Sequence, residues 1–466
     1  MTTKPYYVFT IEGHAYLVKL MTNRVFELSW EEYRAFLLYT QTNEIDPALL
    51  EKYGLNGADV DWEAGRRKRW ETIFAQRHVH CIELMMAQEC NMRCDYCYGE
   101  QNFGGSGLMD VSTAKLAVDR FLEAAPDRCR SMDGGLVISF FGGEPLLNFP
   151  AIQETVSYVW NERKRRDVTF SVTTNLSLLT EEMLTFLNQY PIGLLISFDG
   201  RMQRKYRRLA SGKDSYDLVA ANIQKALAVK PDSIGRATLY GEGNETDMTA
   251  DLRAAGFTRG YITAASGSLM SGKKLKNKND AYWEMLETYP KLTRSYLKAI
   301  RERDEEAYRR ITFDSAFMEA VGRGWNPSPN MISCGCGRTM YAIDVKGDVY
   351  PCHRFVGVSE WKLGNIREPF SALSTKGFSE HVTFLKPECA SCFLRFTCGG
   401  SCLHENYCDV SAPNEEPSLH LPFESFCAYR RLTAELAIHM EHSLDEGDKA
   451  WLRTINRDQR GEETNP

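Results

Sequence analysis

The chain has 466 residues, 43% of them hydrophobic, and this length favours two or three packed domains over a single core. Its net charge of −6 arises from interspersed charges, which gives no sign of a nucleic-acid-binding surface. The most hydrophobic stretches, 136–141 and 192–198, are too short to span a bilayer, and the first residues do not resemble an export signal. We therefore expect a globular cytoplasmic protein with neither nucleic acid nor membrane as a partner.

Residues 1–62 are predicted to form a small α+β module. Ser29 followed by Glu32 has the spacing of a capping box, which predicts the start of a helix. A charged, helical connector is expected over 63–79. The strands of the module are expected at 6–12 and 16–28, the second broken near Asn23, and its shorter helix at 48–52.

A repeated unit of apolar strand and amphipathic helix is predicted from 80 to 312. Such alternation requires right-handed crossovers and favours a parallel sheet. Six units predict an α/β fold with a partial (β/α)6 barrel, and a charged segment at 277–311 is expected to break at Pro290 and to face the barrel. The barrel strands are expected at 81–86, 136–141, 168–173, 193–198, 234–240 and 260–264.

The region 313–440 is rich in Cys, Gly and Pro and has few long periodic segments. A region of this kind needs cross-links for stability, and we expect metal clusters to supply them. Residues 441–466 are predicted to form a C-terminal tail whose polar end is disordered.

Fourteen cysteines in a chain without an export signal favour metal ligation or thiol chemistry over disulfides. Cys90, Cys94 and Cys97 directly follow the first predicted barrel strand, and catalytic loops lie at the C-terminal ends of barrel strands. Three thiolates this close together can hold three corners of a 4Fe-4S cluster, which leaves one iron open for a substrate. The alternative is a structural zinc site, which normally needs four ligands.

The Cys-x3-Cys-x2-Cys spacing, with Tyr96 before the last cysteine, resembles the signature of the radical S-adenosylmethionine (SAM) superfamily. The resemblance implies that Cys90, Cys94 and Cys97 hold the catalytic cluster and that SAM is the cofactor. Segments at the ends of later strands resemble the superfamily's SAM-binding positions, where glycines allow close backbone approach. The implied SAM contacts are Gly142, Gly143, Glu144, Pro145, Thr174, Asn175, Ser197, Asp199 and Arg236.

The C-terminal cysteines resemble the SPASM extension, which in that family holds two auxiliary 4Fe-4S clusters, so three clusters are expected in total. The resemblance places Cys352 and Cys402 at the first auxiliary cluster, together with Cys336, Cys334 or both. If only one of the latter two ligates, an open iron could bind a substrate thiolate. A pair of zinc knuckles is the alternative. The implied ligands of the second auxiliary cluster are Cys389, Cys392, Cys398 and Cys427.

The N-terminal module resembles the winged-helix-like recognition elements that bind the leader of ribosomally made precursor peptides as an added strand. Its alternative role is only to cap the barrel. The order of module, barrel and SPASM region resembles that of sactipeptide and ranthipeptide maturases. This resemblance implies a 5′-deoxyadenosyl radical that removes a hydrogen atom from the peptide, a thioether bond from a substrate cysteine, and a low-potential electron donor such as flavodoxin or ferredoxin.

Other functions are compatible with the same motifs. Carbon-carbon cross-linking of peptide side chains and formylglycine formation in sulfatases use the same barrel. Sulfatase-maturing relatives keep an acidic base after the Ser-x-Asp-Gly segment, whereas here Gly200 leads into the basic run 201–205, which disfavours that activity. That run either favours an acidic substrate or forms a solvated helix face. An iron-sulfur electron carrier or scaffold and a zinc-dependent peptide-binding adaptor are the non-enzymatic alternatives.

Overall fold

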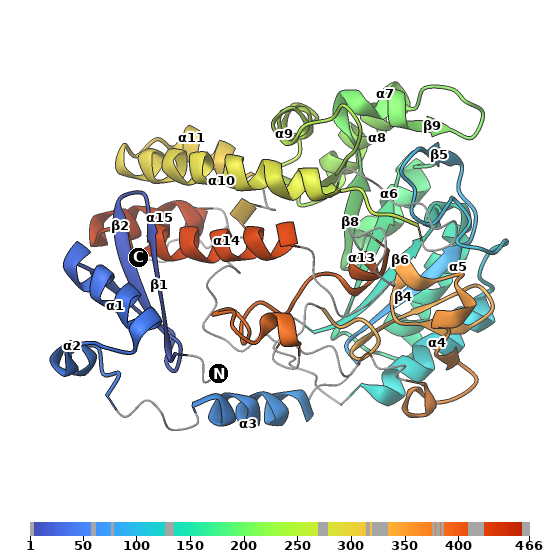
Figure 1. The fold of residues 1–466 in the computed structure, drawn as a ribbon. Coiled ribbons are helices and arrows are strands. Elements are labelled where there is room, and N and C mark those ends of the chain that lie inside the picture. Colours follow the sequence, from blue (N-terminus) through green and yellow to red (C-terminus); the bar gives the residue numbers. More distant parts are fainter. Residues whose placement is uncertain are drawn as a thin grey trace, which may run out of the picture.

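The structure is a computed structural model. Figure 1 shows the N-terminal module at one end and the parallel sheet at the other. Long helices from the second half of the chain lie beside the N-terminal module. The structure describes residues 4–56, 62–75, 79–125, 135–268, 278–313, 317–318, 334–374, 378, 383, 386–408 and 424–458.

The N-terminal module contains a three-stranded antiparallel sheet. The expected break of the segment 16–28 near Asn23 is confirmed, because the chain turns there and Asn23 has a φ of 56°. Helix α1 (Trp30–Thr42) begins at the predicted cap, where Ser29 and Glu32 form a reciprocal capping box. The strands, in the order they pair, are β1 (Tyr6–Ile11), β2 (His14–Lys19) and β3 (Arg24–Leu28).

Two helices follow this sheet. Helix α2 (Pro47–Lys52) occupies the place of the predicted short helix, and α3 (Trp62–Ala75) lies in the predicted connector. An ion pair between Glu63 of α3 and Arg395 ties the connector to the Cys-rich region.

Six parallel strands alternate with helices between residues 81 and 264, which confirms the predicted fold class. They pair in chain order, and the first and last of the six do not pair with each other, so the barrel is partial. The strands are β4 (Cys81–Ala87), β6 (Leu136–Gly142), β7 (Val168–Thr174), β8 (Ile192–Ser197), β10 (Ile234–Leu239) and β11 (Arg259–Ala264).

Alternate residues of the strands face the helices and the barrel interior. In β6, Leu136, Ile138 and Phe140 are buried in the core under the helices, whereas Phe141 faces the interior. The helices that cover the outside are α4 (Val111–Ala124), α5 (Phe149–Ser157), α6 (Glu181–Gln189), α8 (Tyr216–Val229) and α9 (Glu245–Ala254).

The parallel sheet continues into the Cys-rich region, a feature the sequence did not predict. Strand β12 (Met340–Ile343) pairs in parallel with β4, and β13 (Asp348–Tyr350) and β14 (Gly364–Asn365) add antiparallel strands to make nine. Cys352 lies two residues after β13. The barrel sheet therefore fixes the segment that carries this cysteine.

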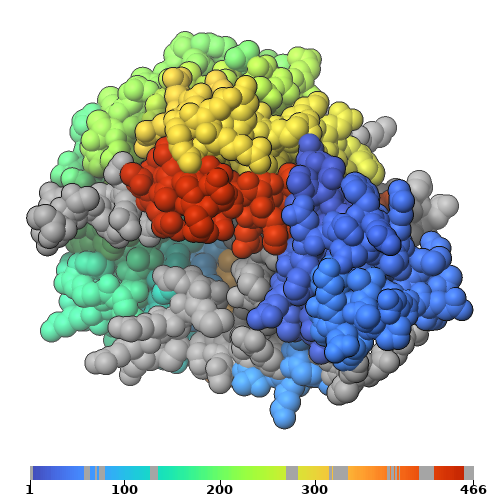
Figure 2. Space-filling view, turned by 90° about the vertical axis from the view of Figure 1, so that its left-hand side faces the viewer, coloured from blue at the N-terminus to red at the C-terminus, as the bar shows by residue number. Residues whose placement is uncertain are grey.

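Four helices form a separate apolar layer: α10 (Lys278–Arg301), α11 (Glu305–Thr312), α14 (Glu424–His442) and α15 (Glu446–Asp458). Figure 2 shows the red atoms of α14 and α15 directly beside the yellow and orange atoms of α10 and α11 and next to the blue N-terminal module. Among the residues described, no helix combines the length and hydrophobicity needed to cross a membrane.

Two expectations for this layer were wrong. Helix α10 continues through Pro290, because Tyr289 and Tyr296 on either side of it are buried in the helical layer, which holds both halves in line. The apolar residues of α10 pack mainly on α14 rather than on the barrel, and Trp283 is exposed. Part of the expected tail forms α15, and residues 459–466 lie outside the described residues.

Candidate functional site

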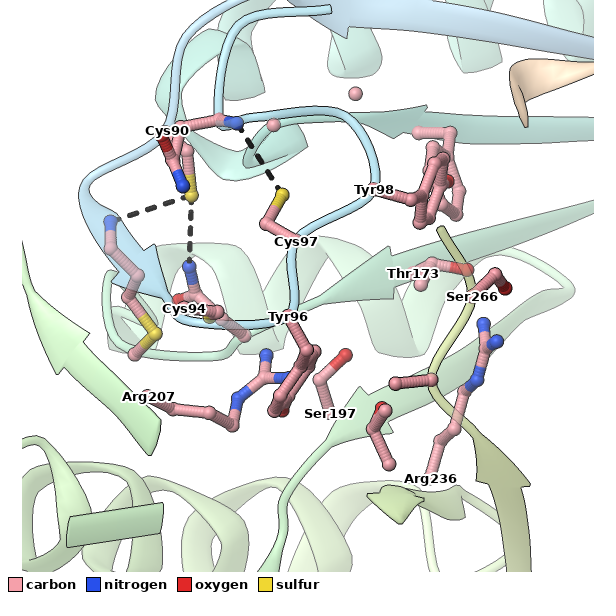
Figure 3. A pocket seen from close by; sticks show the side chains of 18 of the residues that line it. Cys90, Cys94, Tyr96, Cys97, Tyr98, Thr173, Ser197, Arg207, Arg236 and Ser266 are labelled. Carbon is pink, nitrogen blue, oxygen red and sulfur yellow. Dashed lines mark hydrogen bonds between the residues drawn. The ribbon is translucent and has the colours of Figure 1, made fainter. Parts of the chain in front are cut away.

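A cavity opens at the carboxyl ends of the barrel strands (Figure 3). Its empty volume of about 890 Å³ includes space open to solvent. Most of the residues expected to bind the first cluster and SAM line this cavity. They are Cys90, Cys94, Cys97, Gly142, Gly143, Thr174, Asn175, Ser197 and Arg236.

Strand pairing and hydrogen bonds to the thiols hold the loop with the three cysteines in place. Its middle forms strand β5 (Met92–Cys94), which pairs with β9 (Arg207–Leu209) across the cavity mouth. Cys90 Sγ accepts hydrogen bonds from Met92 N at 3.4 Å and Asn175 Nδ2 at 3.9 Å (Figure 3). Cys97 Sγ accepts one from Gln101 N at 3.4 Å. Such bonds favour the thiolate form that binds metal.

The thiols of Cys90 and Cys94 are costly to ionise without a metal. Burial raises the pKa of Cys90 to about 12 and that of Cys94 to about 11, although the Arg207 guanidinium opposes the shift at Cys94. A bound metal ion deprotonates a coordinating thiol and stabilises the buried thiolate. Three thiols around an open cavity therefore fit an iron-sulfur cluster with one accessible corner.

A buried charge network lies behind the cysteine loop. Arg207 Nη1 donates to Tyr96 Oη at 2.8 Å, and Tyr96 Oη donates to Asp199 Oδ2. Thr238 N donates to Asp199 Oδ1 at 2.9 Å. Burial raises the pKa of Asp199, and the charge of Arg207 opposes that shift. Asp199 does not line the cavity and lies behind Tyr96 and Arg207, which do.

Glu144 is also buried behind the wall, and neither it nor Pro145 lines the cavity. Its carboxylate accepts hydrogen bonds from Leu146 N at 3.1 Å, Thr174 Oγ1 at 2.7 Å and Asn175 N at 2.8 Å. Glu144 thus joins the end of β6 to the end of β7.

The backbone of the two preceding glycines forms part of the wall instead. At Gly143 a Cβ atom would lie 2.2 Å from the carbonyl oxygen of Glu89, so no side chain fits there. The turn brings main-chain groups, rather than the acid, to the cavity surface.

Unpaired polar groups in the wall point to a ligand. Tyr98 Oη, Arg207 Nε and Arg236 Nε are buried without a hydrogen-bond partner among the described residues. A buried donor without a partner costs about 1–3 kcal/mol, which a bound polar molecule would offset. SAM carries a carboxylate, an amine and ribose hydroxyls, so the residues present fit it.

Sequence reasoning missed several lining residues. Tyr98 directly follows Cys97, and Arg354 follows Cys352 by two residues, so proximity to the cysteine motifs was the available signal. Arg207 and Ser266 have no such neighbour in sequence. Figure 3 shows Tyr98, Ser266 and Arg236 on the side of the cavity away from Cys90.

The SPASM-like cysteines assemble into two groups. The first cysteine group consists of Cys334, Cys336, Cys352 and Cys402: Cys336 contacts Cys334 and Cys352, and Cys402 interacts electrostatically with the same two. The structure thus brings both Cys334 and Cys336 to this group. The second cysteine group, joined by the same kind of interactions, consists of Cys389, Cys392, Cys398 and Cys427.

Both groups fit metal-thiolate clusters by burial. Burial raises the pKa of Cys389 and of Cys402 to about 12, a cost that metal binding removes. Within the described ranges, no three Cys, His, Asp or Glu side chains converge as ligands of a single metal ion. The two groups are therefore defined by proximity and burial.

Comparison with known proteins identifies the two regions. Residues 84–255 match the model of the radical SAM superfamily, and residues 334–393 match that of SPASM, an iron-sulfur cluster-binding domain. The chain thus contains a radical SAM domain followed by a SPASM domain. SAM binding and iron-sulfur clusters are expected from these two domains.

Two curated relatives align with most of this enzyme. The radical SAM cyclopropyl synthase TigE of Paramaledivibacter caminithermalis is 21% identical over 389 residues, which cover 79% of this chain and 74% of that protein. The cysteine-type anaerobic sulfatase-maturating enzyme of Clostridium novyi is 23% identical over 348 residues, which cover 68% of this chain and 85% of that protein.

Solved structures share the fold. The structure of anSMEcpe with bound AdoMet and Cp18Cys peptide covers 78% of this enzyme and 99% of its own chain, with 18% identity and a TM-score of 0.58. The structure of Streptococcus suis SuiB bound to precursor peptide SuiA covers 91% of this chain and 98% of its own chain, with 14% identity and a TM-score of 0.51.

Proposed function

We propose that this enzyme modifies a ribosomally made precursor peptide and forms a thioether bond between a cysteine sulfur and a carbon of an acceptor residue. The observation that carries the proposal is the position of the cavity. Cys90, Cys94 and Cys97 line one side, and Arg354, which interacts with Cys352 and Cys402, lines another. A peptide in this cavity lies between the radical-generating site and the first cysteine group.

The wall residues have separate roles in this proposal. The bound cluster and SAM supply a 5′-deoxyadenosyl radical, which removes a hydrogen atom from the peptide. Arg236 holds the carboxylate of SAM, since its guanidinium is buried in the wall with an unpaired Nε. The remaining SAM contacts come from Gly142, Gly143, Thr174, Asn175 and Ser197, with Glu144, Pro145 and Asp199 acting behind them.

The proposed domain boundaries follow the sequence prediction. They are a recognition element at 1–62, a connector at 63–79, the barrel at 80–312, the SPASM domain at 313–440 and a terminal segment at 441–466. Within the SPASM domain, the two cysteine groups each hold one auxiliary 4Fe-4S cluster. With the catalytic cluster, the total is three.

The edge of the N-terminal sheet is the proposed leader site. Strand β2 lies in the middle of the sheet and β3 at its edge, and the edge of β3 is the one proposed to pair with a leader as an added strand. The similarity to SuiB, which was solved bound to the precursor peptide SuiA, supports a peptide substrate. A flavodoxin or ferredoxin is the proposed electron donor.

Carbon-carbon bond formation is the second candidate, because the relative TigE is named a cyclopropyl synthase. Formylglycine formation has less support. Asp199 is buried in its network with Tyr96, and no acid follows it before Asp214. The basic run after Gly200 is neutralised on the surface, where Arg201 pairs with Asp251 at 2.9 Å. This pairing supports a solvated surface rather than an acidic substrate.

The test starts with protein reconstituted anaerobically with iron and sulfide. We expect 5′-deoxyadenosine to form with dithionite and SAM, and to fall at least about 100-fold in Cys94→Ala because that site loses a cluster ligand. Cys81→Ala is the matched control, since Cys81 lies on β4 outside all three cysteine sites. No 5′-deoxyadenosine from wild-type protein with a full iron complement would overturn the proposal.

The same assay, with a Cys-rich peptide from a neighbouring reading frame, separates the candidate reactions. Thioether formation removes a pair of hydrogens from the peptide and one thiol from the alkylation count. Carbon-carbon cross-linking removes the hydrogens but leaves every thiol open to alkylation. Mass spectrometry before and after iodoacetamide treatment distinguishes the two.

A further inference from the structure

Arg354 lies in the wall between the cavity and the first cysteine group. Its Nη1 donates to Ser266 Oγ of the cavity wall and to Glu405 Oε1 at 3.2 Å. The guanidinium lies 5.3 Å from the ring centroid of Tyr98. The side chain therefore contacts both the cavity wall and helix α13 (Leu403–Cys408), which begins directly after Cys402.

The charges of this ion pair are shielded from solvent. The side chain of Arg354 is 15% exposed and that of Glu405 is 12% exposed. Arg354 interacts attractively with Cys402 and Cys352, whereas Glu405 interacts repulsively with Cys402. Buried charges are screened less by water and salt than surface charges, so each acts strongly on a neighbouring cluster.

We propose that Arg354 stabilises the reduced state of the iron-sulfur cluster held by the first cysteine group, and that Glu405 limits this effect. The proposal rests on the function proposed above. One-electron reduction adds a negative charge to the cluster, so a nearby buried cation raises its reduction potential and a nearby anion lowers it. Arg354 is thus a positioning residue that acts through the cluster.

This role matches the electron balance of thioether formation. One hydrogen atom leaves the acceptor carbon for the SAM-derived radical, and the thiol proton leaves to solvent. Formation of the carbon-sulfur bond leaves one electron, which a cluster held by the first cysteine group would accept as the oxidant. Tyr98, packed against Arg354 and His404, lies between the cavity and this acceptor.

The test is a redox titration of the reconstituted enzyme, followed by electron paramagnetic resonance, without SAM or peptide. Arg354→Gln is expected to lower the potential of the first auxiliary cluster by about 59 mV, which is a tenfold change in the reduced-to-oxidised ratio. Glu405→Gln is expected to raise the potential, and the double variant to lie between the single variants. Arg354→Lys keeps the charge and is expected to stay near wild type.

Arg431→Gln is the matched control at the other cluster. Arg431 interacts with Cys392 and Cys427 of the second cysteine group, so its loss is expected to shift only that cluster. The signal missing from Cys402→Ala identifies the first auxiliary cluster. If Arg354→Gln fails to retain iron, Glu405→Gln carries the test, because it removes an anion beside the cluster.

The outcomes separate this inference from the proposed function. The potential of the first auxiliary cluster could be unchanged in Glu405→Gln and in any Arg354→Gln protein that retains iron. This result would overturn the role of Arg354 and leave the proposed function standing. If the Cys402→Ala protein shows every cluster signal of the wild-type protein, the placement of an auxiliary cluster at the first cysteine group is overturned. The electron balance above is then overturned with it.

Discussion

The cysteine loop of the radical SAM domain and the cysteine groups of the SPASM domain differ in what holds them in place. The loop contains three cysteines within eight residues, and strand β5 anchors it to β9 at the barrel mouth. The second cysteine group gathers residues from a 3₁₀ turn (Pro387–Cys389), irregular chain and helix α14. Strand pairing holds the first site, whereas in the second group only Cys389 and Cys427 lie in elements of secondary structure.

The first cysteine group is intermediate between these two. Cys336 and Cys352 flank strands β12 and β13, which extend the barrel sheet, whereas Cys402 lies in irregular chain. From this difference we expect the barrel to hold its cysteine loop in place even without a cluster. In the SPASM domain we expect bound clusters to supply much of the structure.

Removal of iron is expected to have the largest effect. It should lower the local stability of the SPASM domain far more than that of the barrel. In apo protein prepared with a chelator, amide hydrogen exchange over 386–408 should accelerate about 1,000-fold, because a structural metal contributes several kcal/mol to a small domain. Strands β6 and β7 should keep their protection, since an apolar core holds them. Equal protection of 386–408 with and without iron would contradict the comparison.

Loss of the buried arginine behind the loop should have the next largest effect. Arg207→Gln leaves Asp199 buried without its neighbouring cation, which is expected to cost about 3–5 kcal/mol of unfolding free energy. Urea unfolding measures this cost, and Asp199→Asn in the same chain should recover part of it. Arg208→Gln is the control, because this neighbouring arginine is exposed and its loss should cost less than about 0.5 kcal/mol.

The outcome for Arg207 tests whether the barrel holds the cysteine loop. If Arg207→Gln unfolds like Arg208→Gln, the network with Tyr96 contributes nothing and the loop depends on its cluster, as the SPASM groups do. A large loss of stability in the apo protein as well would show that the network acts without metal.

The sequence predicted the barrel strands and the groups of cysteines because both depend on local patterns. Strand β12 was missed, since its four residues become a strand only by pairing with β4 from far away in the chain. The helix break expected at Pro290 is absent, because packing of α10 on α14 outweighs one lost backbone hydrogen bond. Local propensity cannot register such long-range contacts.

The sequence predicted which residues lie at the candidate site, but not how their side chains are oriented. A motif places Glu144 at the end of a strand, yet only the fold shows that its carboxylate binds Thr174 and Asn175 behind the cavity wall. Likewise, Tyr96 and Arg207 are 111 residues apart, and pairing of β5 with β9 brings them together. No spacing rule predicts that contact.

The smallest predicted effect concerns the contact between the N-terminal module and the second cysteine group. The ring of Tyr7 stacks on Phe393, next to Cys392, with centroids 3.8 Å apart, and its hydroxyl donates to Glu435 at 2.7 Å. Tyr7→Phe keeps the stacking and loses the hydrogen bond, so it should cost about 1 kcal/mol in the iron-loaded protein. Urea unfolding measures it, with Tyr33→Phe on α1 as the control.

The same substitution in apo protein then sharpens the comparison. If iron builds the second cysteine group, Phe393 is no longer fixed without it, and Tyr7→Phe should cost much less in the apo form. The difference between the two costs measures the coupling between the cluster and the N-terminal sheet, as in a double-mutant cycle. An equal cost in both forms would mean that Phe393 keeps its place without iron, and that the chain alone organises this part of the SPASM domain.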